Sequence, residues 1–313
     1  MMDAMGNGTT IPRAVREATM SKDYILHATA AGGMMRAFFA VTTDTVNEAA
    51  RVHHATPVVS AALGRLLTAG AMMGFMQKND TDQLTLIIRG DGPIGGIVVS
   101  ALKDATVKGY AYHSDAEIPL NAQGKLDVAG AIGKGTLSVI RDIGLKTPVS
   151  GQTELVSGEI AEDITYYFAN SEQVPTAVAL GVMVDRDLSV KQAGGFIIQL
   201  MPGCPEQIAE MLENRLAAFP SLTTLMNEGK KPEDIMDMLL GDLEYTEIER
   251  SPVRFACNCD VERVSRALIS AGREELKKII EEDGEATLHC HFCNKDFYFS
   301  RQDLEEILQQ IMR

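Results

Sequence analysis

Four of the five cysteines lie in the last fifth of the chain, and their spacing constrains the fold more than any other feature. Cys257 and Cys259 form a C-x-C pair, and Cys290 and Cys293 form a C-x-x-C pair after 30 intervening residues. In an oxidising compartment two such pairs favour disulfides, whereas in a reducing compartment they favour a metal site. Four thiolates complete the tetrahedral shell of Zn²⁺, so we predict one zinc ion per chain in the reduced protein.

The amino-terminal residues favour the reducing compartment. Residues 1–19 are polar and lack the apolar segment of a secretory signal, so we predict a disordered leader before the fold begins near Met20. No stretch approaches the roughly 20 apolar residues that a membrane helix needs. We therefore expect a cytoplasmic protein with no membrane partner.

Charge and motif content argue against several functional classes. The formal net charge is −14, which argues against nucleic acid as a partner. Neither G-x-S-x-G nor H-E-x-x-H occurs and the six histidines are scattered, so we predict that the protein is not an enzyme. Two glycine-rich segments, 90–96 and 130–135, lack the Lys-Ser/Thr of a phosphate-binding loop and are predicted to be turns between strands.

The fold class that the patterning predicts is α+β. Residues 20–203 read as a mixed α/β core domain with β-meander sheets and packed helices, because β-rich runs over 84–113 alternate with turn residues. Helices are predicted over 45–53 and from residue 57, a proline, to about residue 77. Three carboxylates of another predicted helix, over 159–171, are interpreted as its solvated face: Glu159, Glu162 and Asp163.

Residues 204–256 differ from the core in composition. They carry eleven acidic and five basic residues and two amphipathic patterns, Glu206–Phe219 and Lys231–Leu243. We predict a helical linker of low local stability that a neighbouring domain must support. Cys204, at its start, is predicted to be a passive, half-buried thiol.

Residues 257–313 form the predicted zinc-binding domain. A tail this short needs a metal to hold a fold, and Asn294 suits the left-handed turn of a metal-binding knuckle. His289 and His291 flank the second pair and are interpreted as lying outside the ligand set. Zinc-held thiolates are the species that oxidants attack, so a redox switch and an inert structural ribbon both remain possible from spacing alone.

The order of these parts resembles the redox-regulated 33 kDa heat-shock chaperones, a family of bacterial holdases also called 33 kDa chaperonins. The resemblance covers about residues 20–300. It depends on the two cysteine pairs and on five further motifs: Arg89–Gly95, Val156–Asp163, Tyr166–Phe168, Ser171–Gln173 with Pro175, and Ala193–Phe196.

This resemblance implies a function and a site. The family's zinc ligands match Cys257, Cys259, Cys290 and Cys293, and the reduced, zinc-bound protein is inactive. Oxidation forms the disulfides Cys257–Cys259 and Cys290–Cys293, releases zinc and unfolds the linker over 204–256. The core and linker then bind unfolded or partially folded client proteins without ATP, and the resemblance suggests a homodimer in the oxidised state.

Two alternatives come from other classes. A thiol oxidoreductase using Cys290 and Cys293 is disfavoured because a helix opens at the C-x-x-C of thioredoxin-like motifs, whereas strand-like residues 296–299 follow here. A zinc-ribbon module that binds nucleic acid or a transcription partner is disfavoured by the negative charge of every segment.

Overall fold

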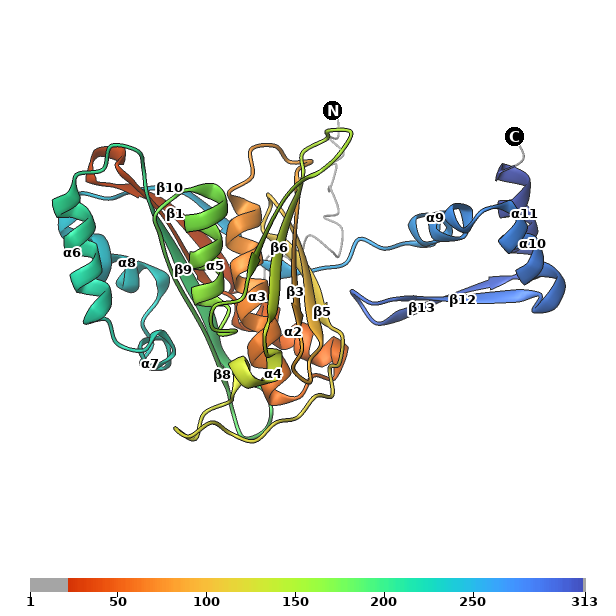
Figure 1. Ribbon diagram of the computed structural model, residues 1–313, viewed down its shortest axis with the longest axis horizontal. Helices are drawn as coiled ribbons and strands as arrows, with labels where there is room; N and C mark the ends of the chain where they lie inside the picture. Colours follow the sequence, from red (N-terminus) through yellow and green to blue (C-terminus); the bar gives the residue numbers. More distant parts are fainter. Residues whose placement is uncertain (1–21, 312–313) are drawn as a thin grey trace, which may run out of the picture.

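The computed structural model describes residues 22–311, and its core consists of two β-sheets that face each other across a central helix (Figure 1). The predicted leader over 1–19 and the predicted start near Met20 lie outside the described residues. The first sheet has the strand order β10-β1-β2-β9-β8, and the second has the order β11-β5-β4-β3-β6-β7. The strands of the first sheet are β1 (Tyr24–Ala30), β2 (Met35–Val41), β8 (Thr176–Val184), β9 (Val190–Leu200) and β10 (Thr246–Pro252). Those of the second are β3 (Gln83–Gly90), β4 (Gly96–Leu102), β5 (Thr106–Ala111), β6 (Gly135–Asp142), β7 (Val149–Glu154) and β11 (Arg254–Phe255).

The meander predicted over 84–113 is confirmed, because β3, β4 and β5 are consecutive antiparallel neighbours. All pairings within the two sheets are antiparallel except that of β11 with β5, which is parallel. A short 3₁₀ turn, η1 (Ala31–Gly33), joins β1 to β2. The alternation of buried and partly buried residues along β3 and β5 fits a sheet with one face toward the core.

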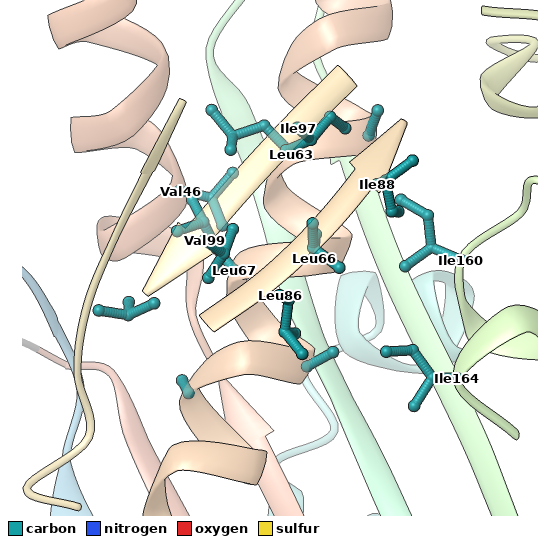
Figure 2. Close-up of a cluster of buried hydrophobic side chains, with 14 of the residues drawn as sticks. Val46, Leu63, Leu66, Leu67, Leu86, Ile88, Ile97, Val99, Ile160 and Ile164 are labelled. Atoms are coloured by element: carbon teal, nitrogen blue, oxygen red, sulfur yellow. The ribbon is translucent and has the colours of Figure 1, made fainter. Parts of the chain in front are cut away.

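The central helix α3 (Pro57–Phe75) begins at the predicted proline and is buried almost all round. Figure 2 shows Leu63, Leu66 and Leu67 of this helix among side chains of β3, β4, α2 and α5. By length and composition α3 could cross a membrane, so the expectation that no such stretch exists was wrong. Because 94% of its apolar window is buried inside the protein, the composition is that of a core helix.

Helix α2 (Thr43–His53) begins two residues earlier than predicted. The cause is a cap from a distant part of the chain. The carboxylate of Asp23 accepts hydrogen bonds from the backbone N–H groups of Asp44 (3.2 Å) and Thr45 (2.6 Å). Asp23 therefore satisfies N–H groups that the first turn of a helix leaves unpaired.

The two glycine-rich segments pack against each other, so their role is structural. Residues 90–96 turn from β3 to β4 as predicted, but the first half of 130–135 lies in a helix, α4 (Val128–Ile132), so the prediction of a turn was only partly right. A Cβ atom on Gly90 would come within 2.0 Å of the Ile132 carbonyl oxygen, which explains the glycine there. The Asp91 carboxylate accepts a hydrogen bond from the Lys134 N–H at 2.7 Å.

The interpretation of Asp163 as part of a solvated face was wrong. Helix α5 (Ala161–Tyr167) continues into a π-helical turn, η2 (Phe168–Glu172). The Asp163 carboxylate is fully buried at the start of α5, where it accepts N–H hydrogen bonds from four residues: Val156, Ser157, Gly158 and Ile160. Glu159 is also engaged, because it forms an ion pair with Arg65.

The segment over 204–256 contains the two predicted helices, α6 (Glu206–Ala217) and α8 (Pro232–Leu240). It adds a short helix α7 (Leu222–Asn227) and a 3₁₀ turn η3 (Gly241–Leu243), and it ends in the strands β10 and β11, which the sequence did not predict. These strands extend one edge of each core sheet. In Figure 1, helices α6 to α8 lie on the face of the first sheet that is turned away from α3.

The carboxyl-terminal part has its own small core and stands apart from the sheets (Figure 1). It contains α9 (Val261–Ala271), α10 (Arg273–Glu282), β12 (Glu285–Cys290), β13 (Lys295–Ser300) and α11 (Arg301–Ile311). The last helix is capped at its start, because the Ser300 N–H and hydroxyl donate to the Asp303 carboxylate at 2.8 and 2.6 Å. In Figure 1 the turn of the β12–β13 hairpin points toward the core.

Candidate metal centre

The structure brings the four predicted cysteines together. Their Sγ atoms all lie within 4.8 Å of one another, although the two pairs are 30 residues apart in the chain. The Sγ atoms of Cys257 and Cys290 are 3.8 Å apart, and those of Cys259 and Cys293 are 3.2 Å apart. All four side chains are half-buried free thiols.

Local structure positions each pair. Cys257 and Cys259 lie in the extended segment between β11 and α9, and Cys290 is the last residue of β12. The turn after Cys290 is closed by two backbone hydrogen bonds to its carbonyl oxygen, from Cys293 N–H at 3.3 Å and Asn294 N–H at 2.8 Å. Asn294 has a φ of +55°, so the predicted left-handed turn is confirmed.

Burial disfavours free thiolates at three of the four cysteines. Burial raises the pKa of the Cys257 and Cys259 thiols to about 11, and it also raises the pKa of Cys293. Cys290 differs: burial opposes its ionisation, but backbone N–H groups of Phe292 and Cys293 donate to its sulfur and lower its pKa. A metal ion that binds here must therefore displace protons from buried thiols, which a soft divalent cation does.

The spacing of the sulfurs fits such an ion. A tetrahedral site with Zn–S bonds of 2.3 Å has S–S edges of about 3.8 Å. The observed separations of 3.2 to 4.8 Å bracket that value. Among residues 22–311, these four cysteines form the only group of three or more potential metal ligands, and an all-sulfur set favours zinc over hard cations.

The neighbouring histidines are engaged elsewhere. The His289 Nδ1 atom lies 2.7 Å from a carboxylate oxygen of Asp296 on the facing strand. The ring of His291 stacks on Tyr110 of β5, with 5.3 Å between centroids. Both histidines thus lie outside the cysteine cluster, as predicted from the sequence.

The centre docks on the core through residues that the sequence did not single out. The Lys108 Nζ donates a hydrogen bond to Asn258 Oδ1 at 2.7 Å and lies 4.8 Å from the centroid of the Phe292 ring. Tyr110 meets Phe292 edge to face at 5.3 Å. Lys108 and Tyr110 are two residues apart in β5 and therefore lie on the same face of the strand. This spacing was the only signal in the sequence that could have identified them as docking residues.

One short strand joins the metal centre to the second sheet. Arg254 and Phe255 of β11 pair with Thr106 and Val107, and the next N–H, of Ala256, donates to the Val107 carbonyl at 3.0 Å. The chain therefore reaches its first cysteine one residue after the last backbone hydrogen bond that attaches this strand to β5.

The linker covers an apolar face of the first sheet. A second hydrophobic cluster joins helices α6, α7 and α8 to β1, β2 and β9. Its buried residues on the sheet side are Leu26, Ala28, Ala30, Met35, Ala37, Phe39, Phe196 and Ile198, and those on the linker side are Leu212, Leu222, Met226, Ile235, Met236, Leu239 and Leu240. Removing the linker would expose this sheet face to water.

The fold and the site together define an α+β protein in which a four-thiol centre, able to hold a metal ion, is joined to a two-sheet core by a covering linker. Comparison with known proteins narrows this class. The family model described as "Hsp33 protein" matches residues 23–300. The chain belongs to the Hsp33 family and is a chaperone, not an enzyme.

Individual relatives agree over nearly the whole chain. The 33 kDa chaperonin of Acetivibrio thermocellus is 50% identical over 290 residues, which cover 93% of this chain and 98% of the relative. That of Clostridioides difficile strain 630 is 49% identical over 291 residues, or 93% and 100% of the two chains. The crystal structure of the Thermotoga maritima 33 kDa chaperonin superposes with a TM-score of 0.84 at 36% identity, covering 93% of this chain and 99% of that one.

Cys204 lies apart from the cluster. It precedes α6, is half-buried, and its Sγ lies 3.8 Å from the Pro205 carbonyl oxygen.

The strand expected after the C-x-x-C pair is confirmed as β13, a context that differs from the helix of thioredoxin-like motifs.

Proposed function

We propose that this protein is a redox-regulated, ATP-independent holdase. The observation that carries the proposal is that the linker, which covers one face of the first sheet, runs directly into the cysteine centre. Strand β11 ends at Phe255, two residues before Cys257, and the linker that precedes this strand covers the apolar face of β1, β2 and β9. A change at the cysteines therefore acts directly on β11, the last strand that attaches the linker to the core.

In the reduced state, Cys257, Cys259, Cys290 and Cys293 hold one zinc ion per chain. The ion supplies the folding energy of a domain whose own apolar core is small. Structural zinc contributes roughly 10–16 kcal/mol to small metal domains, which is about the whole stability of a folded domain. The reduced protein keeps its linker in place and is inactive.

Oxidation by hydrogen peroxide forms the disulfides Cys257–Cys259 and Cys290–Cys293. In each pair one thiolate attacks the O–O bond, which gives a sulfenic acid and releases hydroxide. The second thiolate attacks that sulfur, the S–S bond forms and a second hydroxide leaves. Two peroxide molecules thus take four electrons from four thiolates, and the resulting disulfides would no longer offer the thiolate ligands that hold Zn²⁺.

Loss of the metal removes the support of the linker. Without its knuckle, the tail loses the contacts of Asn258 and Phe292 with Lys108, and β11 remains held by few backbone hydrogen bonds. The linker then leaves the first sheet, and the exposed apolar surface binds unfolded or partially folded proteins. We place this activity in the cytoplasm, with a homodimer as the oxidised form.

Light scattering from a thermally unfolding client enzyme tests the proposal. The protein is added either reduced and zinc-loaded, or after oxidation with peroxide at elevated temperature. Suppression of scattering by the oxidised form alone is the expected result. Equal suppression by both forms would mean a constitutive chaperone with a merely structural zinc, and suppression by neither would overturn the holdase assignment.

A further inference from the structure

A cavity of about 450 Å³ lies between the two sheets, at the end where α3 stops, far along the chain from the cysteines. Its volume is in the range of small-molecule sites. Its walls come from β2 and β9 on one side and from β6 and β7 on the other, with the end of α3 and the π-helical turn η2 between them. Eight aliphatic, methionine or phenylalanine side chains line it: Met73, Met76, Leu84, Val139, Ile143, Val149, Phe168 and Val174.

One cation of this cavity, Arg36, forms no direct ion pair, although the carboxylate of Glu172 in the same lining interacts with it electrostatically. The guanidinium of Arg36 is half-buried, and its Nε donates a hydrogen bond to Gln199 Oε1 at 2.8 Å. Gln199 is fully buried and is itself held, because its Nε2 donates to Thr176 Oγ1 at 3.1 Å. Among residues 22–311, no carboxylate lies within ion-pair distance of Arg36, and its two terminal nitrogens have no hydrogen-bond acceptor. A desolvated guanidinium with free donors favours an anion.

The carboxylates of the cavity already accept hydrogen bonds from protein groups. Glu172 accepts hydrogen bonds from Arg141 at 2.7 Å and from the Tyr167 hydroxyl at 2.5 Å. The buried Asp82 accepts hydrogen bonds from Asn79. Two cations of the lining, Arg36 and Lys78, form no ion pair among residues 22–311, and of these Lys78 is exposed whereas Arg36 is half-buried.

The backbone around Glu172 is unusual. Residues Phe168–Glu172 form a π-helical turn, and Gln173 follows with a φ of +56°. This turn directs both Phe168 and Glu172 to the cavity. π-helical turns are frequent at functional sites, and Glu172 and Gln173 belong to a sequence motif that the redox switch leaves unexplained.

We propose that this cavity is a binding site for an amphipathic organic anion, with its carboxylate on Arg36 and its apolar body among Met73, Met76 and Phe168. A carboxylate matches the two free nitrogens of one guanidinium. A phosphate dianion fits less well, because Glu172 and Asp82 lie in the same lining and would repel the second charge. The site goes beyond the holdase function and does not depend on it.

Isothermal titration calorimetry on the reduced, zinc-loaded full chain tests the site with three probes of equal tail length. Octanoate is expected to bind with one site per chain, octanol more weakly, and octylammonium not at all. Acetate, which has the head group without the apolar body, is expected to bind much more weakly than octanoate. Octanol binding as tightly as octanoate would overturn the proposal, as would an absence of octanoate binding.

Charge variants make the test specific. Arg36→Gln is expected to weaken octanoate binding about tenfold to hundredfold, the usual value of a charged hydrogen bond. Glu172→Gln removes the negative charge near the site and is expected to tighten octanoate binding, a result that a misfolded variant cannot produce. Arg89→Gln, on the exposed end of β3 and outside the lining, is the matched control and is expected to bind as the wild type does. Unchanged affinity in both Arg36→Gln and Glu172→Gln would overturn the assignment.

Discussion

The side-chain amide of Asn294, the residue after the last cysteine, donates a hydrogen bond to the carbonyl oxygen of Val52 at 3.1 Å. Val52 lies in the last turn of α2, where carbonyl groups have no partner within the helix. The knuckle of the metal centre thus completes a helix end of the core. The state of the cysteines and the packing of the core are linked at this point.

Asn294→Gly is expected to weaken this link without changing the knuckle. Glycine keeps the left-handed backbone that position 294 requires, at a φ of +55°, but removes the amide. We expect full zinc content and a loss of roughly 0.5–1.5 kcal/mol in the docking of the tail. Faster hydrogen exchange at the Ala256 N–H in the reduced protein would report this loss, and an unchanged rate would show that the hydrogen bond contributes nothing to docking.

Cys290→Ser is expected to abolish stable zinc binding and to loosen the linker without any oxidant. Its sulfur accepts hydrogen bonds from two backbone N–H groups and completes the four-thiol set, so no other side chain can replace it. Metal analysis together with limited proteolysis of residues 204–256 measures both effects. Cys204→Ser is the matched control, because that thiol lies outside the cluster, and it is expected to keep both zinc and protease resistance.

The sequence predicted the elements that depend on local signals. The clustering of the four cysteines followed from their spacing, and α3 and the meander followed from proline and from apolar periodicity. Strands β10 and β11 were missed because their side chains are mostly exposed and four of the nine are charged, so only backbone pairing with an edge strand defines them. The burial of Asp163 was missed because its partners are backbone N–H groups of the preceding loop, which no side-chain pattern reveals.

Peptide mapping is expected to separate the two possible disulfide pairings. In the reduced structure the Sγ atoms in contact belong to different pairs, Cys257 with Cys290 and Cys259 with Cys293. Trypsin releases Cys257 and Cys259 together in 255–263, and Cys290 and Cys293 together in 279–295. Disulfides within the pairs would leave each peptide separate and lighter by two hydrogens. A cross-linked species that contains both peptides would contradict the proposed pairing.

Asp23→Asn is expected to change how stability depends on pH. Burial raises the pKa of the Asp23 carboxyl from 3.8 to about 6, against the lowering effect of the Thr45 and Asp44 N–H donors. The folded state therefore binds the proton more tightly than the unfolded state. This carboxyl contributes stability that is full below pH 3.8 and is lost as the pH rises to about 6, a difference of about 3 kcal/mol.

The comparison of wild type and variant isolates the contribution of Asp23 to the free energy of unfolding, because the two proteins share all other titrating groups. Denaturant unfolding at pH 4 and pH 7 gives the free energy of unfolding of each protein. We expect the variant to gain stability relative to the wild type as the pH rises between these values. An identical pH dependence in the two proteins would contradict the raised pKa of Asp23.

Leu239→Ala is expected to release part of the linker in the reduced, zinc-loaded protein. Leu239 is buried in the cluster between α8 and the first sheet, and a buried leucine replaced by alanine costs about 2–5 kcal/mol. Met238→Ala changes the neighbouring residue of the same helix, which is exposed, and is the matched control. If the linker is the cover of the client-binding surface, only Leu239→Ala suppresses client scattering before oxidation. Equal inactivity of the two reduced variants, with α8 shown by hydrogen exchange to be loosened in Leu239→Ala, would place the client-binding surface elsewhere in the protein.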